Sequence, residues 1–345
     1  MQPMLRSILP VTLLAAALLP PTVQAASQPH PDYKVLSKLA LGGQGGWDYL
    51  NFDAQRHHLF VSRGDHVLVI DVDQHKQVGN IADTQGVHGI AIAQDLKRGF
   101  TSDGKSASVT VFDLDSLQTV ATISGTGEKP DAIIYDDASH HVLTFNGKSG
   151  NASVIDPIKN AVIATIALPG KPEFAVSDGA GHVYANIEDK SELVQIDSTS
   201  NKVLHTWSLA PCESPSGLAI DRTHHRLFSV CDNQKMAMLD ADNGHLVATM
   251  PIGNGPDAVV FDEATATVYS SNGESGTITA VHEDDPAHFR VTATIPTQPS
   301  ARTLALDPRS HRLYLSAAQW DKTKQANGRP NIVPGSFAIL TVGQP

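Results

Sequence analysis

Residues 256–295 decide the fold of this chain. They read P-D-A-V-V-F-D at 256–262, T-V-Y-S-S at 267–271, N-G-E-S-G at 272–276, T-I-T-A-V at 277–281 and V-T-A-T-I at 291–295. The apolar runs are short, rich in β-branched and aromatic residues, and bounded by turn residues. The stretch therefore predicts one unit of four antiparallel β-strands.

The same unit recurs along the chain. Each copy opens with a short apolar strand, and one position at the start of that strand is occupied in turn by Asp48, His88, Asp131, Glu173, Ser216, Asp257 and Arg302. The steps between these positions are 40, 43, 42, 43, 41 and 45 residues. Four strands repeated at this period are typical of propeller blades. We therefore expect an all-β, seven-bladed β-propeller of four-stranded blades.

The last copy lacks its fourth strand, because the chain ends at Pro345 soon after the apolar run at 337–342. The missing strand is present at the other end. Residues 34–41 (K-V-L-S-K-L-A-L) resemble 202–209 (K-V-L-H-T-W-S-L), the fourth strand of the fourth copy. We expect the N-terminal strand to close the last blade, which protects the free edges of the ring.

The repeat resembles a known family. The second-strand run Leu59-Phe60-Val61-Ser62, the N-G turns and the V-L-V-I-D run ending at Asp71 resemble the YVTN repeat, although the literal Y-V-T-N letters are absent. With the ending Pro334-Gly335-Ser336-Phe337, residues 33–343 resemble the YncE-like β-propellers. This resemblance implies an exported seven-bladed propeller with a binding role.

The N-terminus has the features of a signal peptide. Arg6 precedes an apolar segment at 8–19, and Val23-Gln24-Ala25 provides a small-residue cleavage site. We expect residues 1–25 to be removed and 26–345 to form a single domain in the periplasm or outside the cell, with no transmembrane segment. The alternative is an uncleaved signal anchor, which Pro20 and Pro21 disfavour.

Charge and cysteine content limit the partners. Without Arg6 the chain has 24 basic and 36 acidic residues, a net charge of −12, which disfavours nucleic-acid binding. The two cysteines, Cys212 and Cys231, fall in one repeat, and an oxidising compartment favours a disulfide over two buried thiols. We expect a monomer that binds a small molecule or a protein.

A binding site is expected at one mouth of the central channel. The first strand of every blade starts there, and the loop between the second and third strands opens on the same face. The candidate ligand-binding residues at this mouth are Trp47, Asp48, His88, Asp131, Glu173, Asp257, Arg302 and Trp320. Arg302 and Arg63 are expected to compensate the carboxylates. Trp47 either stacks on a ligand or packs between the first and last blades.

The carboxylates leave a metal open as an alternative. Glu173, Asn186, Asn272 and Asp257 offer the oxygen ligands that Ca²⁺ or another divalent cation prefers, with His88 or Asp131 as a base. Such a site would support hydrolysis of a lactone-type substrate. The simpler interpretation is that these side chains hydrogen-bond the neighbouring blade. The pairs His57-His58, His140-His141 and His224-His225 fall in turns on the opposite face and are interpreted as turn residues.

Two loops depart from the repeat. The glycine-rich residues 42–46 have no helix after them to hold a phosphate, so they are interpreted as a flexible link into the first blade. Residues 317–335 form the largest insertion, with Trp320, Lys322, Lys324 and Arg329 against Asp321. It either covers the channel, docks an anionic partner, or is a solvated loop. With no recognisable nucleophile and base pair, a binding or scaffold propeller is the first hypothesis.

Overall fold

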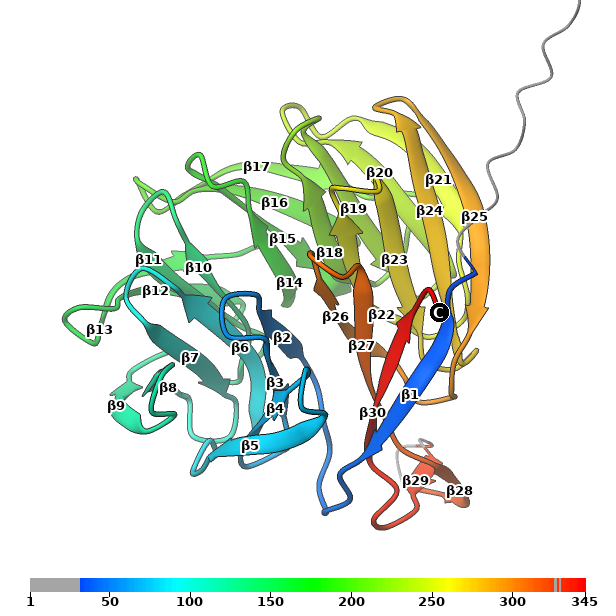
Figure 1. Ribbon diagram of the computed structural model, residues 1–345. Coiled ribbons are helices and arrows are strands. Elements are labelled where there is room, and N and C mark those ends of the chain that lie inside the picture. The colour runs from blue at the N-terminus through cyan, green and yellow to red at the C-terminus, as the bar shows by residue number, and fades with distance from the viewer. Residues whose placement is uncertain (1–31, 326–327, 329) are drawn as a thin grey trace, which may run out of the picture. The chain divides into compact units, whose positions relative to one another are not determined.

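Each sequence repeat folds into a four-stranded antiparallel sheet in the computed structural model, which describes residues 32–325, 328 and 330–345 (Figure 1). The described residues form seven such sheets and one two-stranded hairpin. The inner strands are β2 (Leu50–Asp53), β6 (Val87–Ala93), β10 (Pro130–Asp136), β14 (Pro172–Ser177), β18 (Pro215–Asp221), β22 (Pro256–Asp262) and β26 (Thr303–Asp307). Each inner strand contacts the next, and β26 contacts β2, so the seven blades close into a ring. The predicted fold class is confirmed.

The other strands follow outward in each blade. The second strands are β3 (His58–Ser62), β7 (Arg98–Asp103), β11 (His141–Asn146), β15 (His182–Ile187), β19 (Arg226–Cys231), β23 (Thr267–Asn272) and β27 (Arg312–Ala317). The third strands are β4 (Val67–Asp71), β8 (Ser108–Asp113), β12 (Asn151–Asp156), β16 (Glu192–Asp197), β20 (Lys235–Asp240), β24 (Thr277–Asp285) and β30 (Ala338–Gly343). The outer strands are β5 (Lys76–Ile81), β9 (Thr119–Ser124), β13 (Ala161–Ala167), β17 (Lys202–Ser208), β21 (Leu246–Pro251), β25 (His288–Pro296) and β1 (Lys34–Ala40).

The N-terminal strand closes the last blade as expected. Strand β1 pairs antiparallel with β30, from Lys34 opposite Gly343 to Ala40 opposite Ala338 (Figure 1). Tyr33, just before β1, donates from its hydroxyl to the carbonyl of His311 at 2.9 Å. Two ends of the chain therefore complete one sheet.

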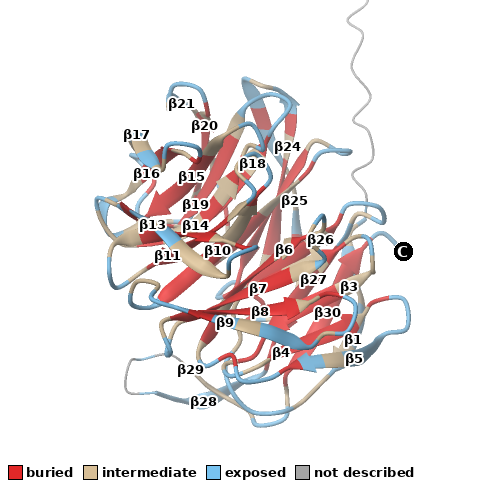
Figure 2. Cartoon of the chain, turned by 90° about the vertical axis from the view of Figure 1, so that its left-hand side faces the viewer, coloured by how far each residue is buried: buried red, intermediate tan, exposed pale blue. Residues whose placement is uncertain are grey.

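The core lies between neighbouring blades. Among the described residues, seven clusters of buried apolar side chains are found, one at each junction; the cluster between blades 3 and 4, for example, includes Phe145 and Val194. Figure 2 shows buried residues along the strands and exposed residues in the loops. Burial of these sheet faces is the main stabilising contribution to the ring.

A recurring turn joins the third and fourth strands. The carboxylate of Asp71 accepts hydrogen bonds from the backbone N–H groups of Asp73 and Gln74, at 3.0 and 2.8 Å. The same turn is built on Asp113, Asp156 and Asp197. An aspartate that accepts from residues two and three positions ahead favours a tight turn over continued strand. Blade 6 lacks this aspartate, and its strands β24 and β25 are longer, at nine residues each.

The predicted signal peptide at 1–25 lies outside the described residues. Besides the strands, the described residues include a short 3₁₀ turn, η1 (Glu188–Lys190). Across the part of the chain that the structure describes, no helix has the length and apolar character needed to cross a membrane.

Candidate functional site

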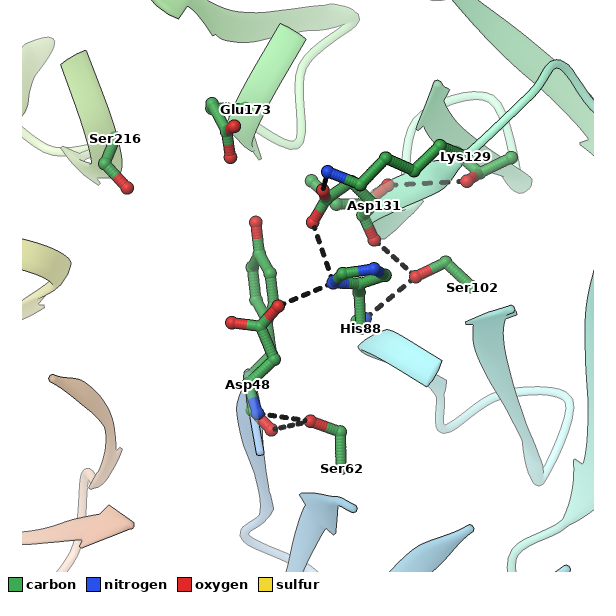
Figure 3. Close-up of polar contacts among 12 residues, drawn as sticks. Asp48, Ser62, His88, Ser102, Lys129, Asp131, Glu173 and Ser216 are labelled. Atoms are coloured by element: carbon green, nitrogen blue, oxygen red, sulfur yellow. Dashed lines mark hydrogen bonds and ion pairs between the residues drawn. The ribbon is translucent and has the colours of Figure 1, made fainter. Parts of the chain in front are cut away.

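The seven residues at the strand starts lie on one rim because of how the inner strands begin. In five blades the register between inner and second strand shifts at this point: Pro130 pairs with Asn146, but the next pair is Ile133 with Thr144. One extra residue is thus accommodated beside Asp131. Such bulges turn side chains away from the regular pleat. Figure 3 shows Asp48, His88, Asp131, Glu173 and Ser216, from five different blades, pointing toward a common space. We call these five residues, with Asp257 and Arg302, the mouth ring.

His88 joins two carboxylates of the mouth ring. Its Nδ1 lies 2.6 Å from Asp48 Oδ2 and 3.5 Å from Asp131 Oδ1 (Figure 3). Asp131 also lies 3.5 Å from the ammonium of Lys129. On the other side, Arg302 Nη2 lies 3.3 Å from Asp48 Oδ1. Asp48 therefore has two close cationic partners, whereas Asp131 has only more distant ones.

The rest of the mouth ring is also paired. The guanidinium of Arg302 binds Asp257, and Ser216 donates to Asp257 Oδ1 at 2.9 Å. Lys171 lies 2.6 Å from Glu173 Oε1 and also binds Glu188. The expectation that Arg302 compensates the ring carboxylates agrees with these contacts. The ring is a nearly continuous network of ion pairs and hydrogen bonds.

The pKa values divide the carboxylates into two groups. Burial opposes ionisation of Asp48, but Arg302 and His88 outweigh it and lower the pKa of this carboxyl. Burial raises the pKa of Asp131 despite the nearby His88. Burial and then the charge of Asp131 raise the pKa of Glu173 to about 8. Although burial opposes it, the hydrogen bond to Asp48 raises the pKa of His88. Asp48 therefore ionises more readily than Asp131 and Glu173, and Glu173 is largely protonated at neutral pH.

Tyr49 is a site residue that the sequence reasoning missed. Its ring stacks on Phe174 with centroids 4.2 Å apart, and its hydroxyl is buried with no hydrogen-bond partner among the described residues. Burial, and then the charges of Asp131 and Glu173, raise the pKa of this hydroxyl well above its ordinary value. A signal was available: the residue after the ring position is small or Thr in five blades, and aromatic only at Tyr49 and Phe174.

Arg63 corrects two expectations. It does not compensate the carboxylates: its guanidinium donates to the carbonyls of Gly42, Gln44, Gly45 and Gly46 at 3.0–3.2 Å. The side chain is fully buried, with its Cζ 3.8 Å from the centroid of the Phe337 ring. The glycine-rich link is therefore bound around Arg63. The positive φ of Gly42, Gly43 and Gly45 allows its carbonyls to converge on one cation.

Two predicted tryptophans have different surroundings. Trp47 packs on Phe337 of the last blade, with ring centroids 5.4 Å apart, as the packing alternative expects. Its carbonyl accepts from Arg302 Nη2 at 2.7 Å. Trp320 begins the hairpin of β28 (Trp320–Lys324) and β29 (Pro330–Ile332) and is exposed. The hydrogen bonds of the described hairpin residues stay within residues 319–336. Arg329 lies outside the described residues.

The four predicted metal ligands all have partners within the protein. Asn186 donates to the carbonyls of Ser216 and Gly217, and its Oδ1 accepts from Ser229 at 3.1 Å. The Oδ1 of Asn272 accepts from Ser270, while its amide donates to Thr277 and Thr279. Glu173 and Asp257 bind Lys171 and Arg302. These contacts favour the simpler interpretation of hydrogen bonds within and between blades.

Two groups of described His, Asp and Glu residues place ligand atoms within 4.8 Å of one another. One is Asp48, His88 and Asp131 of the mouth ring, where His88 already bridges the carboxylates and Arg302 supplies a further positive charge. The other is Asp221, His224 and Glu283. The first group contains both residues predicted as a candidate base, His88 and Asp131, and can exchange a proton between them.

The cysteines form the expected bond. Cys212 and Cys231 are joined by a disulfide, with their Cα atoms 5.6 Å apart. Both are fully buried in the cluster between blades 4 and 5. The bridge ties the loop before β18 to the end of β19, on the same rim as the mouth ring.

The fold and this rim define the class: a seven-bladed β-propeller, closed by its N-terminal strand, with a polar ring contributed by all seven blades. No family model matches the chain. It is YncE-like: it is 24% identical over 213 residues to "Uncharacterized protein YncE" of Salmonella typhimurium. The match spans 59% of this chain and 59% of that relative, less than two thirds of its length.

Solved structures share the fold. A chain of Kuenenia stuttgartiensis hydrazine synthase superposes with a TM-score of 0.69 at 15% identity, covering 85% of this chain and 97% of that one. A chain of the Mitotic Checkpoint Complex superposes with a TM-score of 0.75 at 14% identity, covering 97% and 99%. One neighbour comes from an enzyme and the other from an assembly, so the fold does not specify an activity.

Proposed function

We propose that this chain is an exported binding or scaffold propeller that recognises its ligand or partner at the mouth ring. The observation that carries the proposal is the convergence of polar and charged side chains from all seven blades on one rim. Two groups there, the Asp131 carboxylate and the adjacent Tyr49 hydroxyl, are not fully paired by the described residues. Convergent polar groups with shifted pKa values are typical of binding sites.

The unpaired groups indicate which chemistry the ligand offers. Among the described residues, Asp131 has cations no closer than 3.5 Å, and the Tyr49 hydroxyl has no hydrogen-bond partner. A ligand that donates hydrogen bonds, such as an amine or a polyol, would satisfy both. The stacked rings of Tyr49 and Phe174 provide an apolar surface beside these groups. The combination of a few polar groups with an aromatic surface suits a small polar ligand or a protruding side chain of a partner.

A thermal-shift screen followed by calorimetry tests the proposal. The panel contains amino acids, polyamines, sugars and dicarboxylates, added to the wild type and to Asp131→Asn. The matched control is Asp73→Asn, the same chemical change at an exposed turn on the opposite face. We expect a ligand whose Kd is at least ten-fold weaker for Asp131→Asn and unchanged for Asp73→Asn. Equal affinity in both variants would contradict binding at the mouth ring.

Export is part of the proposal. It is supported by the predicted signal peptide, the disulfide and the similarity to YncE. We propose that residues 26–345 act as a monomer in the periplasm or outside the cell. Cell fractionation with mass spectrometry of the N-terminus tests this: a mature chain starting at Ala26 is expected, and an intact N-terminus in the cytoplasm would overturn it.

The fold neighbours are consistent with scaffolding, since one belongs to a multiprotein complex. The lactone hydrolase is not favoured by any contact at the mouth, because its four predicted ligands are engaged elsewhere. The mouth ring therefore supports recognition better than metal-assisted hydrolysis.

A further inference from the structure

A second cluster of ionisable residues lies on the face opposite the mouth ring. Asp221 ends β18, His224 lies in the following turn, and Glu283 lies near the end of β24 in the next blade. His224 Nδ1 lies 2.6 Å from Asp221 Oδ2 and 3.4 Å from Glu283 Oε1. Inner and third strands both start at the mouth and end on the other face, so the cluster and the mouth ring are separate.

Glu283 is exceptional for its position in the repeat. Glu283 is the first residue of β24 beyond its pairing with β23, and its N–H donates to the carbonyl of Ala266, in the turn after the first strand, at 2.8 Å. The equivalent residues of blades 1, 2, 4 and 5 make the same hydrogen bond. In the first five blades this position holds Val72, Leu114, Pro157, Ser198 and Ala241. None of these is charged. A buried position that holds uncharged side chains in these blades thus holds an acid here.

The Glu283 carboxylate lacks the hydrogen bonds that burial demands. Its side chain is 1% exposed, and neither oxygen has a hydrogen-bond partner among the described residues. Burial of an unpaired carboxylate costs several kcal/mol. Burial, and then the neighbouring Asp221, raise the pKa of Glu283 to about 7. The group is aimed at Asp221 and His224, so a cation between them would remove this cost.

Asp221 turns one of its two carboxylate oxygens toward His224. Its Oδ1 accepts from the backbone N–H groups of Thr223 and His224, at 2.8 and 3.2 Å. These bonds leave Oδ2 facing His224 Nδ1. The side chain of Asp221 is 2% exposed, whereas that of His224 is 44% exposed. The cluster is therefore closed toward the blades and open toward solvent at the imidazole.

Arg226, whose positive charge acts on Glu283, makes its hydrogen bonds to other groups. Arg226 donates from Nη1 to Asp240 Oδ2 at 3.0 Å and from Nε to the carbonyl of Pro286 at 2.7 Å. At the mouth ring, by contrast, Arg302 and Lys171 directly contact the carboxylates. Among the described residues, His224 is therefore the only ion-pair partner of the two buried acids Asp221 and Glu283.

We propose that Asp221, His224 and Glu283 bind a divalent first-row transition-metal ion, of which Zn²⁺ is the best-fitting representative. Imidazole nitrogen selects such ions over Mg²⁺ and Ca²⁺, which prefer oxygen ligands alone. Zinc bonds of about 2.0–2.2 Å place neighbouring tetrahedral ligands about 3.3–3.5 Å apart. The separations of 2.6 and 3.4 Å require only a small outward movement of His224.

The three ligands come from two blades. The ion would therefore join blade 5 to blade 6 at the turn side of the ring. Three protein ligands leave a fourth position on the solvent side, which water or an anionic group would fill. This site is independent of the mouth ring and of what the mouth recognises.

Calorimetric titration of ZnCl₂ into the chelator-treated full chain tests the proposal. The variants are Glu283→Ala and His224→Ala. Alanine is the residue that blade 5 has at the equivalent position, Ala241, so Glu283→Ala is expected to fold. His225→Ala is the matched control, because His225 lies in the same turn but pairs with Asp242 at 2.8 Å. Asp131→Asn controls for the cluster at the mouth.

We expect one Zn²⁺ per chain in the wild type, in His225→Ala and in Asp131→Asn. Affinity should fall at least ten-fold in Glu283→Ala and His224→Ala, each checked for folding by circular dichroism. Unchanged affinity in these two variants overturns the proposal. So does a wild type that binds no Zn²⁺, in which case Asp221 and Glu283 simply share a proton.

Discussion

The guanidinium of Arg302 on blade 7 binds the carboxylate of Asp257 on blade 6. The same guanidinium lies 3.3 Å from Asp48 of blade 1. One side chain thus links the last two blades to the first at the mouth, where the ring of blades closes. Truncating it leaves two partly buried carboxylates without their main cation.

Replacement of Arg302 by Met is therefore expected to lower the free energy of unfolding by about 1–2 kcal/mol. This cost is smaller than that of breaking a fully buried ion pair, because the Arg302 side chain is partly exposed. Urea unfolding measures the change. In a double-mutant cycle, Asp257→Asn should cost less in the Arg302→Met background than in the wild type. Additive effects would show that the pair does not couple.

Arg63 should be intolerant of even a conservative change. Lysine at this position offers three donors on a flexible stem and cannot reproduce a planar fork that reaches four carbonyls. We expect Arg63→Lys to lower the free energy of unfolding by about 2–4 kcal/mol, because the buried cation loses most of its carbonyl partners. Limited proteolysis should then cut the glycine-rich link at residues 42–46. A link that resists cleavage in the variant would contradict the role given to Arg63.

Asp103 predicts a pH dependence of stability. Burial raises its pKa in the folded chain to about 6, above the ordinary value of 3.8, so the folded state holds this proton more tightly than the unfolded state. The contribution of Asp103 to the free energy of unfolding is therefore greatest below about pH 4, falls as the pH rises toward 6, and is constant above that. Asp103→Asn should remove the fall and raise the free energy of unfolding at pH 7 by about 1–3 kcal/mol.

Blades 3 and 6 have asparagine at the position equivalent to Asp103. Asn146 and Asn272 pair with Pro130 and Pro256 as Asp103 pairs with Val87. The reverse change, Asn146→Asp, serves as the control and should introduce the same pH dependence. Denaturant unfolding between pH 4 and 8 measures both, and parallel curves for wild type and Asp103→Asn would rule out the assignment.

Substitutions of Tyr49 should affect the stability of the fold and ligand binding differently. Its buried hydroxyl has no hydrogen-bond partner in the part of the chain that the structure describes. Tyr49→Phe is therefore expected to leave the free energy of unfolding unchanged or raise it by about 1 kcal/mol. The stack on Phe174 is kept in this variant, whereas Tyr49→Leu loses it and should be destabilising. A ligand that donates to the hydroxyl should bind Tyr49→Phe more weakly. A clear loss of stability in Tyr49→Phe would reveal an internal partner for the hydroxyl.

Much of the fold could be read from the sequence because it depends on local patterns. The apolar strand runs recur in every copy, and equivalent positions such as Asp131 and Asp257 are separated by whole repeats. Residues 34–41 match the fourth strand of another copy. Repetition fixes strand number and closure, since each copy must pack on the next. The ring positions followed from the same alignment.

The direction of individual side chains could not be read in this way. The position of Arg63 in the repeat led us to expect contacts with the mouth carboxylates. It donates instead to carbonyls of residues 42–46, and their placement depends on the backbone conformation of this link, which the repeat does not predict. Glu283 belongs to a blade junction, where its neighbours Asp221 and His224 come from another repeat. Contacts between copies depend on how the blades pack, which an alignment of the copies does not describe.

The pairing of β1 with β30 brings together residues about three hundred positions apart. A chain emerging from a ribosome can form its first six blades one after another, but β1 has no partner until the last strand appears. We therefore expect closure of the ring to be the last step of folding. Under the proposed export, closure this late would leave the chain open while it crosses the membrane.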